Sequence, residues 1–273
     1  ARLDHDSSFG YHVTPKLYGN WTIDENWALK GGISAGYKKP ELKENKSDFT
    51  SVYGAYPYDE IGIGNDDLKP EESINTELGI YWQQDALALD ATVFHTKFKN
   101  KISDYTICTG TEDDPCVYNG YEALSVSQYF NVSDAEIFGL ELNGDWQVTE
   151  SLKANANYTY THSEQKSGVN QGYALNEFPS SMANLSLTWN ATSNLDLWTK
   201  AGWRSRSPNA ATSRRDDAYA LVDLGARYHL NRNITLMAGV YNLFDVSANR
   251  NFANRQTPLI EGRRYNFGAR YEF

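Results

Sequence analysis

The 273-residue chain contains no run of about 18 or more apolar residues, which excludes membrane-spanning helices because each needs about 20 such residues. Its net charge of -10 argues against nucleic acid as a partner, since phosphate binding requires a basic surface. The five histidines lack the spacing of zinc ligands, and no G-x-S-x-G motif occurs. The sequence therefore predicts no metal site, no cofactor and no enzyme.

Cysteine is also scarce, and the only two residues, Cys108 and Cys116, lie close together in a polar stretch. They are placed for a disulfide within one loop, which implies an oxidising compartment such as the periplasm or the cell surface. A pair of free thiols is the alternative. We expect the disulfide.

What the chain has in abundance is alternation of apolar and polar residues, the pattern of a half-exposed strand. In the C-terminal GRRYNFGARYEF, aromatic or small apolar residues occupy every second position up to Phe273. Helical periodicity is almost absent. The pattern predicts eleven strands, at 13–23, 27–37, 74–82, 87–98, 137–148, 151–161, 182–190, 195–205, 219–230, 233–243 and the C-terminal segment.

The connections between these strands alternate strictly between short and long. Short polar turns lie at 24–26, 83–85, 149–150, 191–194 and 231–232. Long polar segments lie at 38–72, 103–129, 163–179, 206–218 and 245–262. In an antiparallel up-and-down meander, all short turns then lie at one end, as in a transmembrane β-barrel with short periplasmic turns and long outer loops.

Tryptophan supports the same fold. Six of the seven tryptophans lie near the short-turn end, namely Trp21, Trp27, Trp82, Trp146, Trp189 and Trp198. Amphipathic rings settle at membrane–water interfaces, so we expect an aromatic girdle there. The apolar face of each strand then meets lipid, the polar face meets a wet lumen, and Phe273 anchors the last strand at the periplasmic interface.

The strand count indicates that the barrel is incomplete. Outer-membrane chains normally begin on the periplasmic side and have an even number of strands. Eleven strands that start from the outer side leave two open edges, which is costly because lipid offers no hydrogen bonds. We therefore expect residues 1–273 to be the C-terminal part of a larger barrel.

Several segments resemble TonB-dependent outer-membrane receptors. They are NDDLKPEESINTELGIYW (65–82), ATVFHTKFKNKI (91–102), YFNVSDAEIFGLELNG (129–144), VYNLFD (240–245) and the C-terminal EGRRYNFGARYEF. A narrower resemblance, in GGISAGYKKPEL (31–42) and NYTYTHSEQKSG (157–168), is to the catecholate siderophore receptors, the subgroup of the ferric enterobactin and colicin I receptors.

This resemblance implies a plugged barrel of about 22 strands, of which the N-terminal plug and first barrel strands are absent here. It implies a multi-pass location in the outer membrane of a Gram-negative bacterium, contact with the TonB complex through the missing N-terminal region, and a ferric siderophore as transported ligand. A passive porin, a surface adhesin, or a receptor for cobalamin or haem are the alternatives. Haem receptors of the family use a histidine in the region of residues 38–71, which contains none.

Ferric catecholates are anionic and aromatic, which favours arginine for charge and tyrosine for stacking. The candidate ligand residues are Arg204, Arg206, Arg214, Arg215, Arg250, Arg255, Arg263, Tyr53, Tyr56 and Tyr58, with Arg264 beside the last loop. Alternatively, the arginines bind lipopolysaccharide phosphates or pair with neighbouring acids, and the tyrosines pack within their loop. Membrane lipid, colicins and phage are further candidate partners.

Overall fold

The computed structural model describes the whole chain except residues 55–59, 132–133, 169–170, 176–178, 209–214 and 248–259. The described residues form β-strands joined by turns and longer connections. Among them, no helix is long and apolar enough to cross a membrane.

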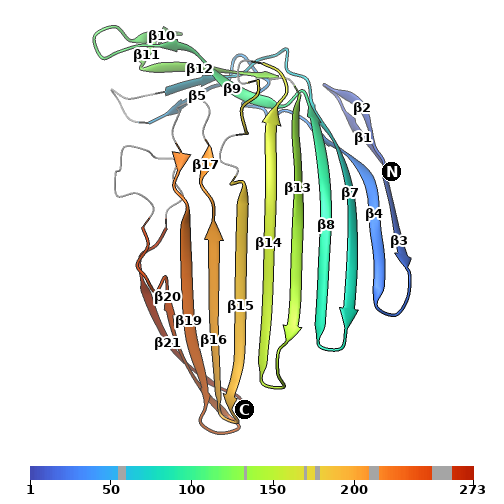
Figure 1. Cartoon of the computed structure of the whole chain (residues 1–273). Helices are drawn as coiled ribbons and strands as arrows, with labels where there is room; N and C mark the ends of the chain where they lie inside the picture. The colour runs from blue at the N-terminus through green and yellow to red at the C-terminus, as the bar shows by residue number, and fades with distance from the viewer. Residues whose placement is uncertain (55–59, 132–133, 169–170, 176–178, 209–214, 248–259) are drawn as a thin grey trace.

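Eleven strands form one antiparallel sheet that curves into an open arc (Figure 1). This confirms the predicted meander, with shifted boundaries: residues 13 and 14 belong to a separate hairpin, and the strands predicted at 74–82 and 151–161 span 71–84 and 152–165. In spatial order, the strands are β21 (Arg264–Tyr271), β20 (Ile234–Tyr241), β19 (Tyr219–His229), β16 (Leu195–Arg204), β15 (Ser181–Thr192), β14 (Leu152–Gln165), β13 (Ala135–Gln147), β8 (Leu87–Lys99), β7 (Glu71–Gln84), β4 (Trp27–Lys38) and β3 (Lys16–Thr22).

The short turns all lie at one end of the sheet and the long connections at the other, here called the outer end (Figure 1). Side chains shape several of the turns. Asp24 accepts hydrogen bonds from the backbone N–H groups of Asn26 and Trp27, both at 2.8 Å. Asp85 has a φ of 48° between β7 and β8. Asp and Asn suit such turns because they bond nearby backbone and tolerate positive φ.

Strand register sorts the side chains of the sheet onto two faces. Residues directly opposite each other point the same way, so Leu142, Tyr158, Ala183 and Trp203 share one face across four neighbouring strands. Apolar side chains on this face are exposed, up to 79 % for Phe267. A continuous exposed apolar band is the surface that a barrel presents to lipid. The other face carries the polar and charged residues and is the lumen face.

The register corrects the predicted girdle at one position. Trp21, Trp27, Trp82, Trp146 and Trp189 lie on the lipid face near the short turns, as expected. Trp198 lies opposite Gly225, and its row of paired residues continues to Gly239 and Asn266, all on the lumen face. Proximity to a turn correctly predicted the position of Trp198 along the barrel axis. It did not predict which face of the sheet the ring lies on.

The outer connections contain strands that alternation did not predict. Four of them form a sheet, here called the loop sheet, in the order β5 (Thr50–Tyr53), β6 (Glu60–Ile63), β12 (Ser125–Asn131) and β9 (Ile102–Thr109). The other strands pair as hairpins: β1 (Arg2–Asp6) with β2 (Gly10–Thr14), β10 (Cys116–Tyr118) with β11 (Tyr121–Ala123), and β17 (Ser207–Pro208) with β18 (Arg215–Asp216).

The buried apolar core of the described residues lies in these connections rather than in the eleven-stranded sheet. Ile61, Ile63 and Val126 of the loop sheet pack with Cys116 and Ala123 of the β10–β11 hairpin. Ile61 is 1 % exposed. The outer connections are therefore held as a small folded unit in water, whereas the large sheet relies on lipid to cover its apolar face.

The two faces predict opposite responses to an added charge. We expect Leu185→Arg, on the lipid face, to destabilise the inserted protein by about 2–4 kcal/mol if it lies near the bilayer midplane. Asn184→Arg is the matched control, because Asn184 is the preceding residue and faces the lumen. Denaturant unfolding in lipid vesicles measures both. Equal destabilisation by the two variants would contradict the assignment of faces.

Candidate functional site

The candidate site lies at the outer end, where the long connections leave the strands of the large sheet (Figure 1). One amide side chain ties two of these connections to the barrel. The side chain of Asn131 donates to the backbone oxygens of Lys69 (2.8 Å) and Asn100 (2.7 Å) and accepts from the Lys69 N–H (2.7 Å). These three hydrogen bonds of Asn131 attach the segments 64–70 and 125–131 to the end of β8.

The stretch NDDLKPE (65–71) supplies the other half of this anchor. Asn65 donates to the backbone oxygen of Tyr129 at 2.9 Å, and Leu68 is buried. Glu71 accepts from the Ile102 N–H at 2.8 Å and lies 3.5 Å from Lys38 Nζ. The segment with the strongest family resemblance therefore has a structural task, namely attachment of the loop sheet to the barrel rim.

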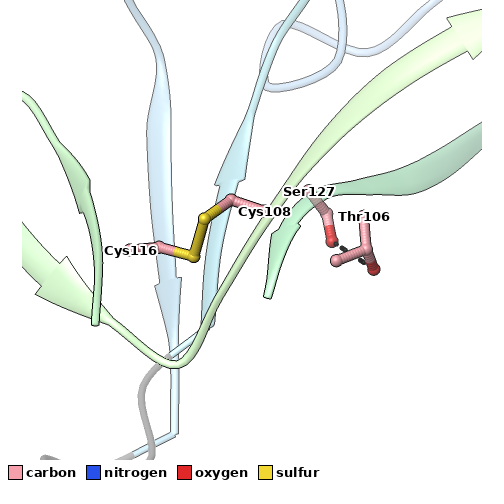
Figure 2. The surroundings of a disulfide bond; sticks show 4 residues. All are labelled: Thr106, Cys108, Cys116 and Ser127. Atoms are coloured by element: carbon pink, nitrogen blue, oxygen red, sulfur yellow. Dashed lines mark hydrogen bonds between the residues drawn. A yellow bond between two sulfur atoms is a disulfide. The ribbon is translucent and has the colours of Figure 1, made fainter. Parts of the chain in front are cut away.

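A disulfide joins Cys108 of β9 to Cys116 of β10 (Figure 2). It holds the β10–β11 hairpin against the apolar side of the loop sheet, where Cys116 is 3 % exposed. Ser127 and Thr106 lie on neighbouring strands close to this link, 3.4 Å apart between their hydroxyl oxygens. The disulfide and the buried core together fix the shape of this connection.

The opposite side of the loop sheet is polar. Ser127 donates to Glu60 at 3.1 Å, and Tyr53, which is 45 % exposed, lies against Gly62. Burial and a hydrogen bond to Tyr53 raise the pKa of Tyr129 well above its usual value of 10.0. Tyr53 is thus held by Tyr129 with part of its ring open, while Tyr56 and Tyr58 lie outside the described residues.

The candidate arginines near the end of β16 have different surroundings. Arg204 ends β16 on the lumen face, opposite Tyr219, and its guanidinium donates to Ser207 Oγ at 3.3 Å. Arg206 is exposed and lies 3.7 Å from Asp217, an ion pair that water weakens. The backbone of Arg215 pairs with Pro208 in the β17–β18 hairpin. Arg214 lies outside the described residues.

Around the last connection, Arg264 has the more constrained position. It opens β21 on the lumen face, pairs with Glu261, and its guanidinium lies 5.6 Å from the ring centre of Tyr241, a cation–π contact. The Arg263 N–H donates to Asp245 at 2.8 Å, and its side chain is exposed. Arg250 and Arg255 fall outside the described residues.

The outer connections differ in charge around the arc. Connections 39–70 and 100–134, which build the loop sheet, contain thirteen acidic and five basic residues. Connections 205–218 and 242–263 contain six arginines and four acidic residues. An approaching anion is therefore directed toward the side of β16 to β21, where the described arginines Arg204 and Arg264 face the lumen.

Comparison with known proteins gives one family. The family model described as "TonB dependent receptor-like, beta-barrel" matches residues 1–243. The iron-regulated outer membrane virulence protein of Vibrio cholerae is 37 % identical over the whole chain, which covers 41 % of that protein. The ferric enterobactin receptor of Pseudomonas aeruginosa is 31 % identical over 89 % of the chain, which covers 34 % of that receptor.

Solved structures agree with these relatives. A crystal structure of a mutant ferric enterobactin receptor from Pseudomonas aeruginosa in complex with enterobactin has a TM-score of 0.70 and 29 % identity. It matches 89 % of this chain and 37 % of its own length. The chain therefore spans about two fifths of the length of the curated relatives first matched.

The anchor at Asn131 predicts a local loss of stability when it is removed. Asn131→Ala removes three hydrogen bonds, each worth about 0.5–1.5 kcal/mol. We expect faster hydrogen exchange in the loop sheet and unchanged exchange in the strands of the barrel. Asn131→Asp keeps the oxygen that accepts from Lys69 but turns a carboxylate toward the backbone oxygens of Lys69 and Asn100, so it should speed loop exchange as well. Unchanged loop exchange in both variants would show that the connections are held elsewhere.

The raised pKa of Tyr129 predicts a loss of loop-sheet stability in alkali. The folded state holds this proton more tightly than the open state, so its contribution is complete below pH 10.0 and declines as pH rises above that value. Ultraviolet absorbance of phenolate should show a late ionisation that Tyr129→Phe removes. Tyr121→Phe, at a 65 % exposed site, is the control and should leave that late ionisation in place. An early ionisation of Tyr129 would contradict its burial.

Proposed function

The chain belongs to the TonB-dependent receptor family, and we propose that it is part of a receptor that takes up a ferric siderophore. It lies in the outer membrane of a Gram-negative bacterium, where the apolar band of its sheet meets lipid. Two of its relatives, an iron-regulated outer membrane protein and a ferric enterobactin receptor, support iron as the cargo.

The two edges of the sheet support the proposal that these residues are one part of a longer barrel. In the described part of the chain, β3 and β21 each pair on one side only. Their free backbone groups would be unsatisfied in lipid, so further strands are needed to close the sheet. The eleven antiparallel strands make both edge strands run toward the short-turn end. An odd number of additional strands therefore completes an antiparallel barrel.

Energy for transport is proposed to come from the TonB complex, through an N-terminal region that residues 1–273 do not include. This chain would supply part of the outer binding surface and of the lumen wall. Lipopolysaccharide is proposed to surround the outer rim, and colicins or phage are proposed as further ligands of the same outer connections.

The observation that carries the cargo proposal is the lumen-facing pair Arg204 and Arg264 on the basic side of the outer end. Both guanidiniums are held, one by Ser207 and the other against Tyr241. A ferric catecholate presents negative charge and aromatic rings, which suit a guanidinium next to an aromatic side chain. We propose that this pair forms the floor of the binding site, and that Arg206, Arg214, Arg215, Arg250, Arg255 and Arg263 are further candidate ligand residues.

The loop sheet has a different role in this proposal. Its acidic residues repel an anion, so Tyr53, Tyr56 and Tyr58 would meet the ligand through their rings rather than through charge. The sheet would act as a wall that confines the chelate to the basic side. Its attachment through Asn131 and Glu71 gives this wall a defined position over the barrel.

The cargo proposal predicts that Arg204→Gln combined with Arg264→Gln weakens binding of ferric enterobactin at least tenfold, about 1.4 kcal/mol. The loss reflects two cations that face the ligand. Binding to the whole receptor is measured by equilibrium titration on intact cells. Arg232→Gln is the control, because Arg232 lies in the short turn between β19 and β20 at the far end of the barrel. Wild-type affinity in a normally inserted double variant would remove the pair from the site.

A further inference from the structure

A hollow of about 590 Å³ lies on the lipid face of the sheet, across strands β8, β13, β14, β15, β16 and β19. Its lining combines small residues with larger ones around them, among them Gly144, Ala156, Ala183, Ala201, Leu142 and Trp203. These strands lie in the middle of the sheet, away from both open edges. Further strands that close the barrel therefore leave this hollow open to the membrane.

Distances along the strands place a row of charges at the outer surface of the membrane. Leu152 lies opposite Trp189 of the girdle, and His162 lies ten residues further along β14. For a strand tilted by about 40° with a rise of about 3.3 Å per residue, this is about 25 Å of height, which equals the apolar band of an outer-membrane barrel. Glu136 and Glu164 pair one lipid-facing position further out, so they lie at the level of the lipid headgroups.

At this level, cationic side chains gather on the outward face around Glu136. The amines of Lys97 and Lys166 each lie 3.7 Å from its carboxylate, and His95 Nε2 lies at 3.6 Å. Lys97 is 60 % exposed, whereas Glu136 is 33 % exposed. Within the described part of the chain, the ammonium of Lys97 donates no hydrogen bond, because 3.7 Å is too long for one. Its three donors are therefore open to an anion in the headgroup layer.

Between the charges and the hollow, the lipid face changes from polar to apolar. Phe138 and Tyr160 pack edge to face, with ring centres 6.3 Å apart. The hydroxyls of Tyr158 and Ser181 follow, 3.1 Å apart, at the outer border of the hollow. Tyr158 lies six residues from Glu164 along β14, about 15 Å in height, which is about half the thickness of the hydrocarbon core. The hollow is therefore at the depth of the acyl chains of the outer leaflet.

We propose that this face binds one anionic glycolipid of the outer leaflet, with a phosphate at Lys97 and Lys166 and an acyl chain in the hollow. The hydroxyls of Tyr158 and Ser181 are placed to donate to the carbonyl oxygens that join headgroup and chains. Along the strands, the order of cation, hydroxyl and apolar hollow matches the order of groups in such a lipid. A chain in the hollow gains the dispersion contacts that the small residues leave unmade. The site is independent of the transported cargo.

The test titrates the purified full-length receptor with lipid A, the phosphorylated anchor of lipopolysaccharide, and counts bound lipid by native mass spectrometry. We expect Lys97→Gln combined with Lys166→Gln to weaken binding of the first lipid at least tenfold. Ala183→Leu combined with Ala201→Leu fills the hollow and should weaken it at least fivefold. The matched controls are Lys153→Gln, which faces the lumen, and Ala154→Leu, which faces lipid on β14 outside the hollow. Both should bind lipid A as the wild type does.

Leucine suits a lipid-facing position, so the filled variant should insert normally, which the heat-dependent electrophoretic mobility of the barrel verifies. Equal affinity of the wild type for lipid A and for its dephosphorylated form would overturn the phosphate site. Wild-type affinity in both combined variants would show that lipid A binds elsewhere. If filling the hollow instead dissociates a cross-linked complex with another membrane protein, the hollow is a protein interface and the lipid site is wrong. None of these results bears on uptake of ferric enterobactin, which tests the proposed function separately.

Discussion

The structure depends on one constraint, which is that a strand in lipid must satisfy its backbone hydrogen bonds through its neighbours. The eleven-stranded sheet meets this by continuous antiparallel pairing from β3 to β21. Once the pairing is set, period-two geometry sends every second side chain to lipid and the rest to the lumen. The apolar band, the polar lumen and the need for further strands at both edges all follow from this pairing.

The outer connections are stabilised differently from the large sheet, because water rather than lipid surrounds them. They need a buried core. Ile61, Ile63 and Val126 form it together with the β10–β11 hairpin, which the disulfide links to β9. Asn131 and Glu71 then fix this unit to the barrel rim. The charge of the connections separates into an acidic side with the loop sheet and a basic side near β16 to β21. Under the proposed function, the acidic side repels an anionic ligand and the basic side attracts it.

The sequence predicted the large sheet well because alternation is strong wherever one face meets lipid, as in Tyr265 to Phe273. It did not predict the loop sheet, because β6 and β12 pair in parallel between segments far apart in the chain. Trp198 was assigned to the girdle by its distance from a turn, whereas its face follows from the exact register with Gly225. The sequence around Asn131 contains no pattern that indicates its anchoring role. The candidate ligand residues remain predictions.

This barrel is proposed to serve TonB-dependent uptake of a ferric siderophore. The most direct test is uptake of radioactive iron as ferric enterobactin by iron-starved cells that lack their own catecholate receptors and express the full-length protein. We expect accumulation that disappears when TonB is deleted, while binding at the cell surface persists. Accumulation that is the same with and without TonB would contradict it and would indicate a passive pore.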